Sequence, residues 1–260
     1  MIEREPPPGA IAPLPLGATL AGTGRTLFRN SGALTKIAAL PFLLGMAFDF
    51  ATPFIALPWQ DLLRLIWFNL LWVLFTVSWL RFVLLKENSS ARFFPRPARR
   101  HLYFAGYALL LGVLDLLLML GWYHFAADPA TEPIPDVTYW LAYAFIGFVK
   151  VRFAFIFPAL AVDERYSLGY AWRHSHSASL PLFAIFVVAV VLPGAMLTYG
   201  INALSAAFAD NVLLLYALWL LWHSGTWVIE AIYATFVAIA FRRCTGWVAA
   251  PDQSVLERFE

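Results

Sequence analysis

The sequence predicts an all-α fold: a polytopic membrane bundle of about six transmembrane helices, with short interfacial helices and both termini in the cytoplasm. Three observations support this prediction: the composition, the number of long apolar stretches and the one-sided placement of basic residues. The 260 residues are 61% hydrophobic and 13% charged, whereas soluble domains are about 45–50% apolar and about 25% charged. The 17% aromatic content suits rings that anchor helices at two bilayer interfaces.

Six apolar stretches are long enough to cross about 30 Å of hydrocarbon. Their approximate limits are 33–57, 62–85, 102–127, 138–162, 180–204 and 212–241. Pro158 and Pro193 lie inside two of them, and we expect kinks there because proline donates no backbone hydrogen bond. The chain then divides into a cytoplasmic lead with an interfacial helix (1–32), a transmembrane domain (33–243) and a cytoplasmic tail (244–260).

The basic residues gather at one side of these stretches. Five lie between Lys86 and His101, and others precede the first stretch or follow the fourth and the sixth. Arg64 is the basic residue expected on the opposite side, among several acidic ones. The positive-inside rule makes the basic side the cytoplasm. We therefore expect a multi-pass protein of a bacterial inner (cytoplasmic) membrane.

The loop after the second stretch is a candidate lipid-binding segment. Its candidate contacts to anionic phospholipid headgroups are Lys86, Arg92, Arg96, Arg99 and Arg100. Because the loop is flanked by bilayer, phospholipid is the expected partner, and no nucleic-acid motif is present. Segments 24–29, 98–103 and 170–175 also mix basic and aromatic residues, as interfacial helices do. The alternative is that they are ordinary cytoplasmic loops, which are commonly basic and aromatic.

The stretch from Arg152 to Ser175 has a recognisable order of residue types. A basic residue in a helix is followed by a proline, an acidic exit and a short helix with Arg and Ser: Arg152, Pro158, Asp163, Glu164, Ser167 to Ala171, Arg173 and Ser175. With Gly24 to Pro41, this layout resembles a broad, poorly characterised group of bacterial six-helix integral membrane proteins, including the membrane domain attached to some glycerophosphoryl diester phosphodiesterases. The resemblance implies the fold and no catalytic residues. The phosphodiesterase activity belongs to a separate barrel of about 250 residues, for which this chain has no room.

Charged side chains at membrane depth are candidates for function, because each costs a few kcal/mol unless it is paired or in water. The candidate polar cluster comprises Asp49, Asp115, Lys150, Arg152, His223 and Glu230. Lys150 and Glu230 lie at similar depth on helix faces with small neighbours, so we expect them to approach each other. Such a pair either fixes helix packing or lines a polar cavity for a proton, an ion or a lipid headgroup.

The positions of Arg152, Asp163 and Glu164 suggest structural roles for these residues. Arg152 lies about 200° around the helix from Lys150. The fourth helix therefore has protein or water on both sides, or Arg152 reaches toward the inner leaflet. Asp163 and Glu164 are expected to cap the short helix that follows.

No motif points to catalysis. Asp49 and Asp115 lack the glycine-flanked context of paired-aspartate intramembrane proteases, and Ser224 is not in a nucleophile elbow. Cys244 is the only cysteine, and no zinc-binding motif is present. We expect no catalytic residue, cofactor or metal site.

These observations favour a non-enzymatic integral membrane protein that acts through interaction, as a scaffold, an assembly factor or a regulatory subunit of a membrane complex. Its partner would be another membrane protein or a second copy of the chain. The alternative is a small transporter, channel or lipid-handling protein that uses the mid-membrane charges. An enzyme acting on lipids is a third and weaker reading.

Overall fold

The computed structural model describes residues 14–54, 59–86, 98–126, 136–164 and 167–248. All regular structure in these ranges is helical. The α-helices are α1 (Leu16–Arg29), α2 (Ser31–Ala51), α3 (Trp59–Leu85), α4 (Arg99–Ala126), α5 (Asp136–Phe153), α6 (Ile156–Ala161), α7 (Leu168–Ser175), α8 (Ser179–Phe186), α9 (Leu192–Ala207) and α10 (Val212–Thr245). Shorter elements are the 3-10 turns η1 (Thr52–Phe54) and η3 (His176–Ala178) and the π-helical segment η4 (Val187–Val191).

Five helical stretches of the described chain are long and apolar enough to cross a membrane. They cover 31–51, 62–85, 144–161, 168–207 and 212–245, and each coincides with an expected apolar stretch. Helix α4, with 28 residues, occupies the place of the remaining expected stretch. The length and composition of these helices identify a multi-pass membrane protein.

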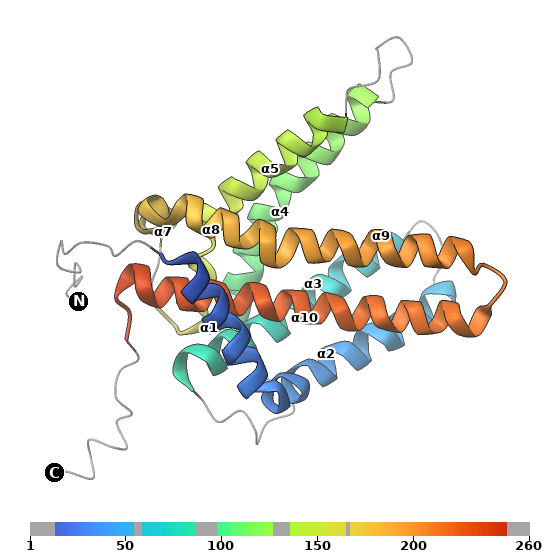
Figure 1. The fold of residues 1–260 in the computed structure, drawn as a ribbon, viewed down its shortest axis with the longest axis horizontal. Helices are drawn as coiled ribbons and strands as arrows, with labels where there is room; N and C mark the ends of the chain where they lie inside the picture. The colour runs from blue at the N-terminus through green and yellow to red at the C-terminus, as the bar shows by residue number, and fades with distance from the viewer. Residues whose placement is uncertain (1–13, 55–58, 87–97, 127–135, 165–166, 249–260) are drawn as a thin grey trace.

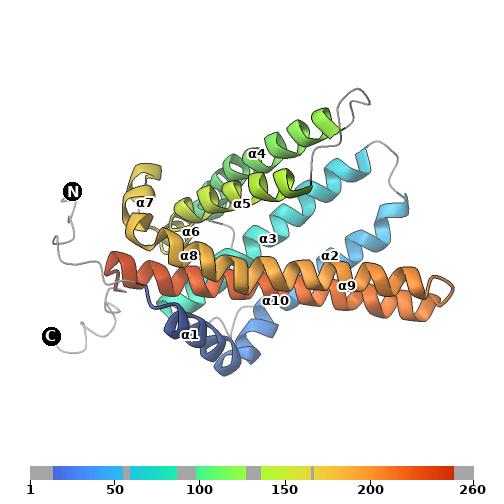
Figure 2. The ribbon, with the colours of Figure 1, turned by 45° about the horizontal axis from the view of Figure 1, so that its top comes forward.

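The long helices form hairpins that share one end and separate toward the other. Hairpins α2–α3, α4–α5 and α9–α10 meet near α1, α6 and α7 (Figure 1). From there α4–α5 points away from α9–α10, and the two hairpins remain apart after the molecule is turned (Figure 2). The bundle is therefore closed at the end that carries α1 and open at the other.

The core lies at the closed end. Most of α10 from Ala231 to Cys244 is buried, against the buried second half of α3 and the short helix α6. Trp79 of α3 is fully buried, and its indole N–H donates to Thr235 Oγ1 of α10 at 2.8 Å. At the open end the helices present exposed apolar side chains, as a protein surrounded by lipid requires. These include Leu109, Leu117, Met196 and Leu213.

Two spanning stretches are interrupted in front of prolines. Helix α5 ends at Phe153, and a turn precedes α6. Pro158 cannot donate to the Ala154 carbonyl, which instead accepts from Phe157 N at 3.2 Å. Pro193 leaves the carbonyl of Ala189 without the usual partner, and Ala189 lies inside the π-helical segment η4. The interruptions occur at the two prolines for which the sequence predicted kinks.

Two of the three expected interfacial segments form separate short helices, and the third does not. Segments 24–29 and 170–175 lie in the separate short helices α1 and α7, whereas segment 98–103 forms the start of α4. Ser167 caps α7 by accepting from Tyr170 N at 3.2 Å. The prediction that Asp163 and Glu164 cap this helix is therefore wrong.

Candidate functional site

The first polar cluster, the Asp49 cluster, joins α2, α3 and α10. The side chains of Asp49 and His223 are 8% and 4% exposed. Asp49 Oδ2 lies 2.7 Å from His223 Nε2, and Asp49 Oδ1 lies 3.3 Å from Nη2 of Arg64. The Asp49–His223 contact is an ion pair when the His223 ring is protonated. The cluster therefore holds one carboxylate against two groups from other helices.

The α2–α3 hairpin explains this arrangement. Asp49 lies in the last turn of α2, and Arg64 lies in the second turn of α3. Aromatic rings of α3 and α10 surround His223 at centroid distances of 4.7–6.0 Å: Phe68, Trp219 and Trp222.

An Asp–His pair can activate a nucleophile, but none is hydrogen-bonded to this one. Ser224, the next residue, donates its hydroxyl to the Leu220 carbonyl at 2.8 Å. Within the described ranges no hydroxyl or thiol hydrogen-bonds to His223. The cluster brings together a carboxylate, a guanidinium and an imidazole from three helices.

The second cluster, the Glu230 cluster, joins α3, α5 and α10. The indole N–H of Trp72 donates to Glu230 Oε2 at 2.8 Å, and the charge of Lys150 acts on the same carboxylate. The expected approach of Lys150 to Glu230 stays a prediction. Trp72 is a direct partner of the carboxylate, and sequence reasoning missed it. The Trp72 ring packs against Phe104 and Phe157 at 5.5 and 6.1 Å, which fixes its orientation.

The third cluster, the Arg152 cluster, attaches α7 to the end of α5. Arg152 is 5% exposed. Its Nη2 donates to the Trp172 carbonyl at 2.9 Å, and its guanidinium lies 3.9 Å from the centre of the Trp172 ring. Its Nη1 is 3.3 Å from Nδ1 of His176, and Ser175 donates to the Arg152 carbonyl at 2.8 Å. Of the two alternatives for Arg152, the structure shows protein on its side of α5.

The fourth cluster, the Asp163 cluster, lies at the closed end. Asp163 Oδ2 is 3.0 Å from Nη1 of Arg81 and 2.6 Å from Nη1 of Arg100. Asp163 adopts a left-handed φ of 62°, and Glu164 N donates to the Ala159 carbonyl at 2.9 Å. This pattern ends α6 as a Schellman motif. Asp163 and Glu164 therefore end α6, and Asp163 also joins α3 to α4.

The predicted lipid contacts are only partly described. Arg92 and Arg96 lie outside the described residues, as does the side chain of Asp115. Lys86 and Arg99 are exposed at the ends of α3 and α4. Arg100 is engaged by Asp163, so the part of its charge available to a headgroup is reduced. At the two ends of this loop, Lys86 and Arg99 remain exposed to anionic lipid.

Neither a metal centre nor a relative identifies the chain. Within the described ranges, no three His, Cys, Asp or Glu side chains are placed to hold a metal ion. Comparison with protein-family models, with curated proteins and with solved structures found no match.

Proposed function

We propose that the chain is a non-enzymatic integral membrane protein of a bacterial inner membrane, which acts by binding another membrane protein as a scaffold, an assembly factor or a regulatory subunit. In this proposal the chain crosses the bilayer six times, with α4 as the additional span, and both termini are cytoplasmic. The polar clusters support it, because they join side chains of different helices and thereby hold the bundle together. No relative supports or opposes an enzymatic activity.

The exposed face of α9 is the observation that carries the proposal. Along one side it carries the small residues Gly200, Ala203 and Ala207, and Thr198 and Asn202 add polar groups further around the helix; all five are exposed. Small residues let helix backbones approach closely in a membrane, and amide or hydroxyl side chains add hydrogen bonds between helices. The exposed side chains of α4 are mainly leucines, for example Leu109, Leu116 and Leu117. We therefore assign the α9 face to a partner helix and the α4 face to lipid.

Crosslinking in cells tests this assignment. A photo-crosslinking amino acid at Tyr199 or Ala203 of α9 should give a discrete protein adduct, whereas the same group at Leu109 or Leu117 of α4 should give none. Equal adducts on both helices, or none on α9, would contradict the proposal. The identity of the adduct separates a second copy of the chain from a different protein.

A matched pair of substitutions sharpens the test. A Cβ at Gly200 of α9 or at Gly106 of α4 would meet nothing within 4 Å, so both positions accept a side chain without internal clashes. Gly200→Leu should abolish the adduct formed from Tyr199, because it blocks close helix approach. Gly106→Leu should leave that adduct unchanged. Loss of the adduct in both variants would indicate a general effect on the fold.

Transport is the second candidate, and the interrupted helices favour it. Discontinuous helices commonly line the binding sites of transporters, and α5–α6 lies close to α8. A Cβ at Gly147 of α5 would meet ring atoms of Phe186 and Phe183 at 3.4 and 3.6 Å. Lys150 lies one turn further along α5, where its charge acts on Glu230.

The double variant Lys150→Met with Glu230→Leu separates the two candidates. Removing both charges should be tolerated if the pair is structural, since paired charges often break even against apolar replacements. Adduct formation from Tyr199 should then persist. If the pair lines a pathway, the wild-type chain in liposomes should conduct protons under an applied voltage, as reported by a trapped pH dye. The double variant should remain folded and abolish that flux.

A further inference from the structure

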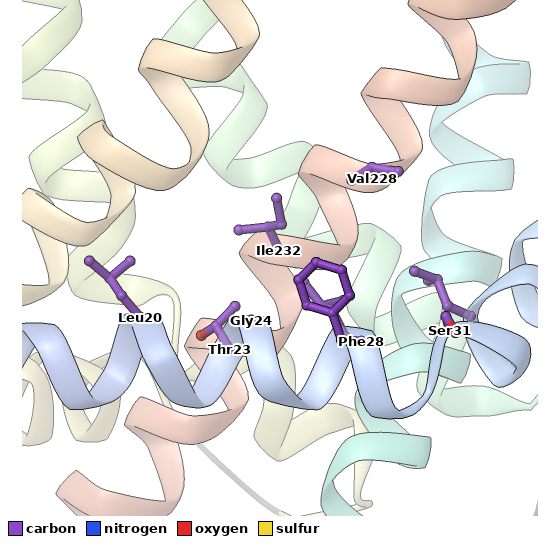
Figure 3. Close-up of a pocket in the computed structure, with 9 residues that line it drawn as sticks. Leu20, Thr23, Gly24, Phe28, Ser31, Val228 and Ile232 are labelled. Carbon is purple, nitrogen blue, oxygen red and sulfur yellow. The ribbon is translucent and has the colours of Figure 1, made fainter.

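The short helices α1 and α7 are held on the closed end of the bundle in different ways. Between α1 and α10 lies an apolar pocket of about 420 Å³, and none of the residues that line it is titratable. Its lining residues include Leu20, Gly24, Phe28, Val228 and Ile232 (Figure 3). Helix α7 is instead held on α5 by polar contacts of Arg152, one of them with a histidine. The attachment of α7 therefore contains a group that changes charge near neutral pH.

The contact between Arg152 of α5 and His176 fixes the protonation of the histidine ring. Nη1 of Arg152 lies 3.3 Å from Nδ1 of His176. A guanidinium is always charged and has donors but no acceptor, so Nδ1 of His176 accepts this hydrogen bond and carries no proton. His176 is exposed at the start of η3, which leaves its ring accessible to protons from solvent. The contact is therefore made only while the ring is neutral.

A second proton on the His176 ring would turn this hydrogen bond into a contact between two cations. Arg152 is 5% exposed, and no carboxylate of the described residues forms an ion pair with it. Its Nε is buried without a hydrogen-bond partner in the same part of the chain. Like charges at this separation repel strongly where water is largely excluded. The docked position of His176 is therefore incompatible with a protonated ring.

The other charged groups near α7 and η3 do not offset the added charge. At this end, the titratable or cationic side chains of the helices packed against them are Lys150 and Arg152 of α5, Arg173 and His174 of α7, and Arg242 and Arg243 of α10. Helix α8 has none. Of the described acidic residues at the closed end, Asp163 is held by Arg81 and Arg100. The other, Glu164, accepts from the Trp247 indole.

We propose that His176 and Arg152 form a pH-sensitive latch for α7: the helix is docked on α5 while His176 is neutral and is released when the ring gains a proton. The released state binds one more proton than the docked state, so docking weakens as the pH falls. The change falls between about pH 8 and pH 5, the range in which histidine side chains change charge. The latch is separate from the α9 face and needs no partner protein.

His174 provides a matched control on the same helix. Its Nδ1 lies 3.0 Å from the Tyr170 carbonyl oxygen, which can only accept, so this nitrogen donates. A proton at Nδ1 is present in the charged ring as well as in one neutral tautomer, and gain of charge does not break the contact. His174 and His176 thus differ in the property on which the latch depends.

Hydrogen exchange of the full chain in phosphatidylcholine nanodiscs tests the latch. Exchange rates in 168–175 are measured at pH 8 and pH 5 and divided, at each pH, by those of the variant His176→Asn. This ratio cancels the intrinsic effect of pH on exchange, and the asparagine oxygen can accept from Arg152 at either pH. The ratio should rise about tenfold from pH 8 to pH 5, the effect of losing one hydrogen bond to a charged group.

Two controls distinguish the latch from a general loosening at low pH. His174→Asn should show the same rise as the wild type, because it leaves His176 in place. In α1, whose pocket with α10 has no titratable lining residue, the ratio should stay near one. A constant ratio in 168–175, an equal rise in α1 or loss of the rise in His174→Asn would overturn the proposal.

Discussion

At the scale of the residue, each described charge of the candidate cluster has a specific neighbour. Asp49 contacts Arg64 and His223, and Glu230 accepts a hydrogen bond from Trp72. The buried Arg152 donates a hydrogen bond to the Trp172 carbonyl. A membrane interior makes such contacts necessary, because a charge without a partner there costs several kcal/mol. The contacts hold helices together that the hydrophobic effect alone would not hold, since lipid is as apolar as leucine.

Asp49 and His223 should be energetically coupled. Asp49→Asn removes the charge that faces His223 and Arg64, and His223→Gln removes the ring. We expect each change to destabilise the chain by on the order of 1 kcal/mol, because Arg64 is 46% exposed and can find other partners. The double variant should lose less than the sum of the two. Thermal unfolding in mild detergent measures this, and strictly additive losses would show that the residues do not interact.

Arg152 should not be replaceable by lysine. The guanidinium both donates to the Trp172 carbonyl and stacks on its ring, and an ammonium cannot make both contacts in this geometry. Arg152→Lys should therefore loosen α7 from α5, seen as faster hydrogen exchange in 168–175. Arg173→Lys is the matched control, because Arg173 is exposed on α7. Similar exchange rates in both variants would argue against the docking role of Arg152.

At the scale of the element, glycines set how closely helices approach. A Cβ at Gly225 of α10 would come 2.6 and 3.1 Å from the two Cδ atoms of Leu197 of α9. The α9–α10 hairpin is therefore packed closely at Gly225, although its outer surface is exposed. Elsewhere on the same hairpin, Gly200 has open space beside it.

Alanine substitution should distinguish these glycines. Gly225→Ala forces Leu197 to move and should destabilise the chain by about 1–3 kcal/mol, the usual cost of overpacking. Gly200→Ala should be neutral or slightly stabilising, because alanine favours the helix more than glycine does. Unfolding of the two variants in the same detergent provides the comparison. Equal stability of both would mean that Leu197 is free to turn away.

At the scale of the whole molecule, the closed end coincides with the end that the basic residues assign to the cytoplasm. The Asp163 cluster, the end of α10 and the helices α1 and α7 lie there. Arg242 donates to the Leu84 carbonyl, and Trp247 donates to Glu164 Oε1 at 3.2 Å. Basic and acidic groups thus tie the chain segments together at that end, whereas the hairpins separate at the other.

Cysteine labelling tests the orientation. The natural Cys244 is 5% exposed, so it is replaced by alanine and a new thiol is placed at an exposed site. Val248, which is 82% exposed, follows α10, and Asp210 lies between α9 and α10. A membrane-impermeant maleimide should label Val248→Cys only in inverted vesicles and Asp210→Cys only in intact spheroplasts. The reverse pattern would refute the orientation inferred from the positive-inside rule.

The sequence alone determined the membrane class, the places of the helices and the positions where they break. Hydrocarbon admits only segments that satisfy their own backbone hydrogen bonds, so long apolar runs become helices. Proline removes one of those bonds, which explains the interruptions before Pro158 and Pro193, although α2 continues without a break through Pro41. The sequence also singled out Asp49, Arg152, His223 and Glu230, because charge in an apolar run is conspicuous.

Only the tertiary structure decided which of these residues meet. Trp72 and Glu230 are 158 positions apart, and nothing in the local pattern of either helix relates them. In a soluble protein the apolar stripe of a helix shows which side faces the core. In lipid both sides are apolar, so hydropathy carries no record of how a helix is rotated. The pairing of Asp49 with Arg64 and the pocket between α1 and α10 depend on that rotation, and on the close approach that glycine allows.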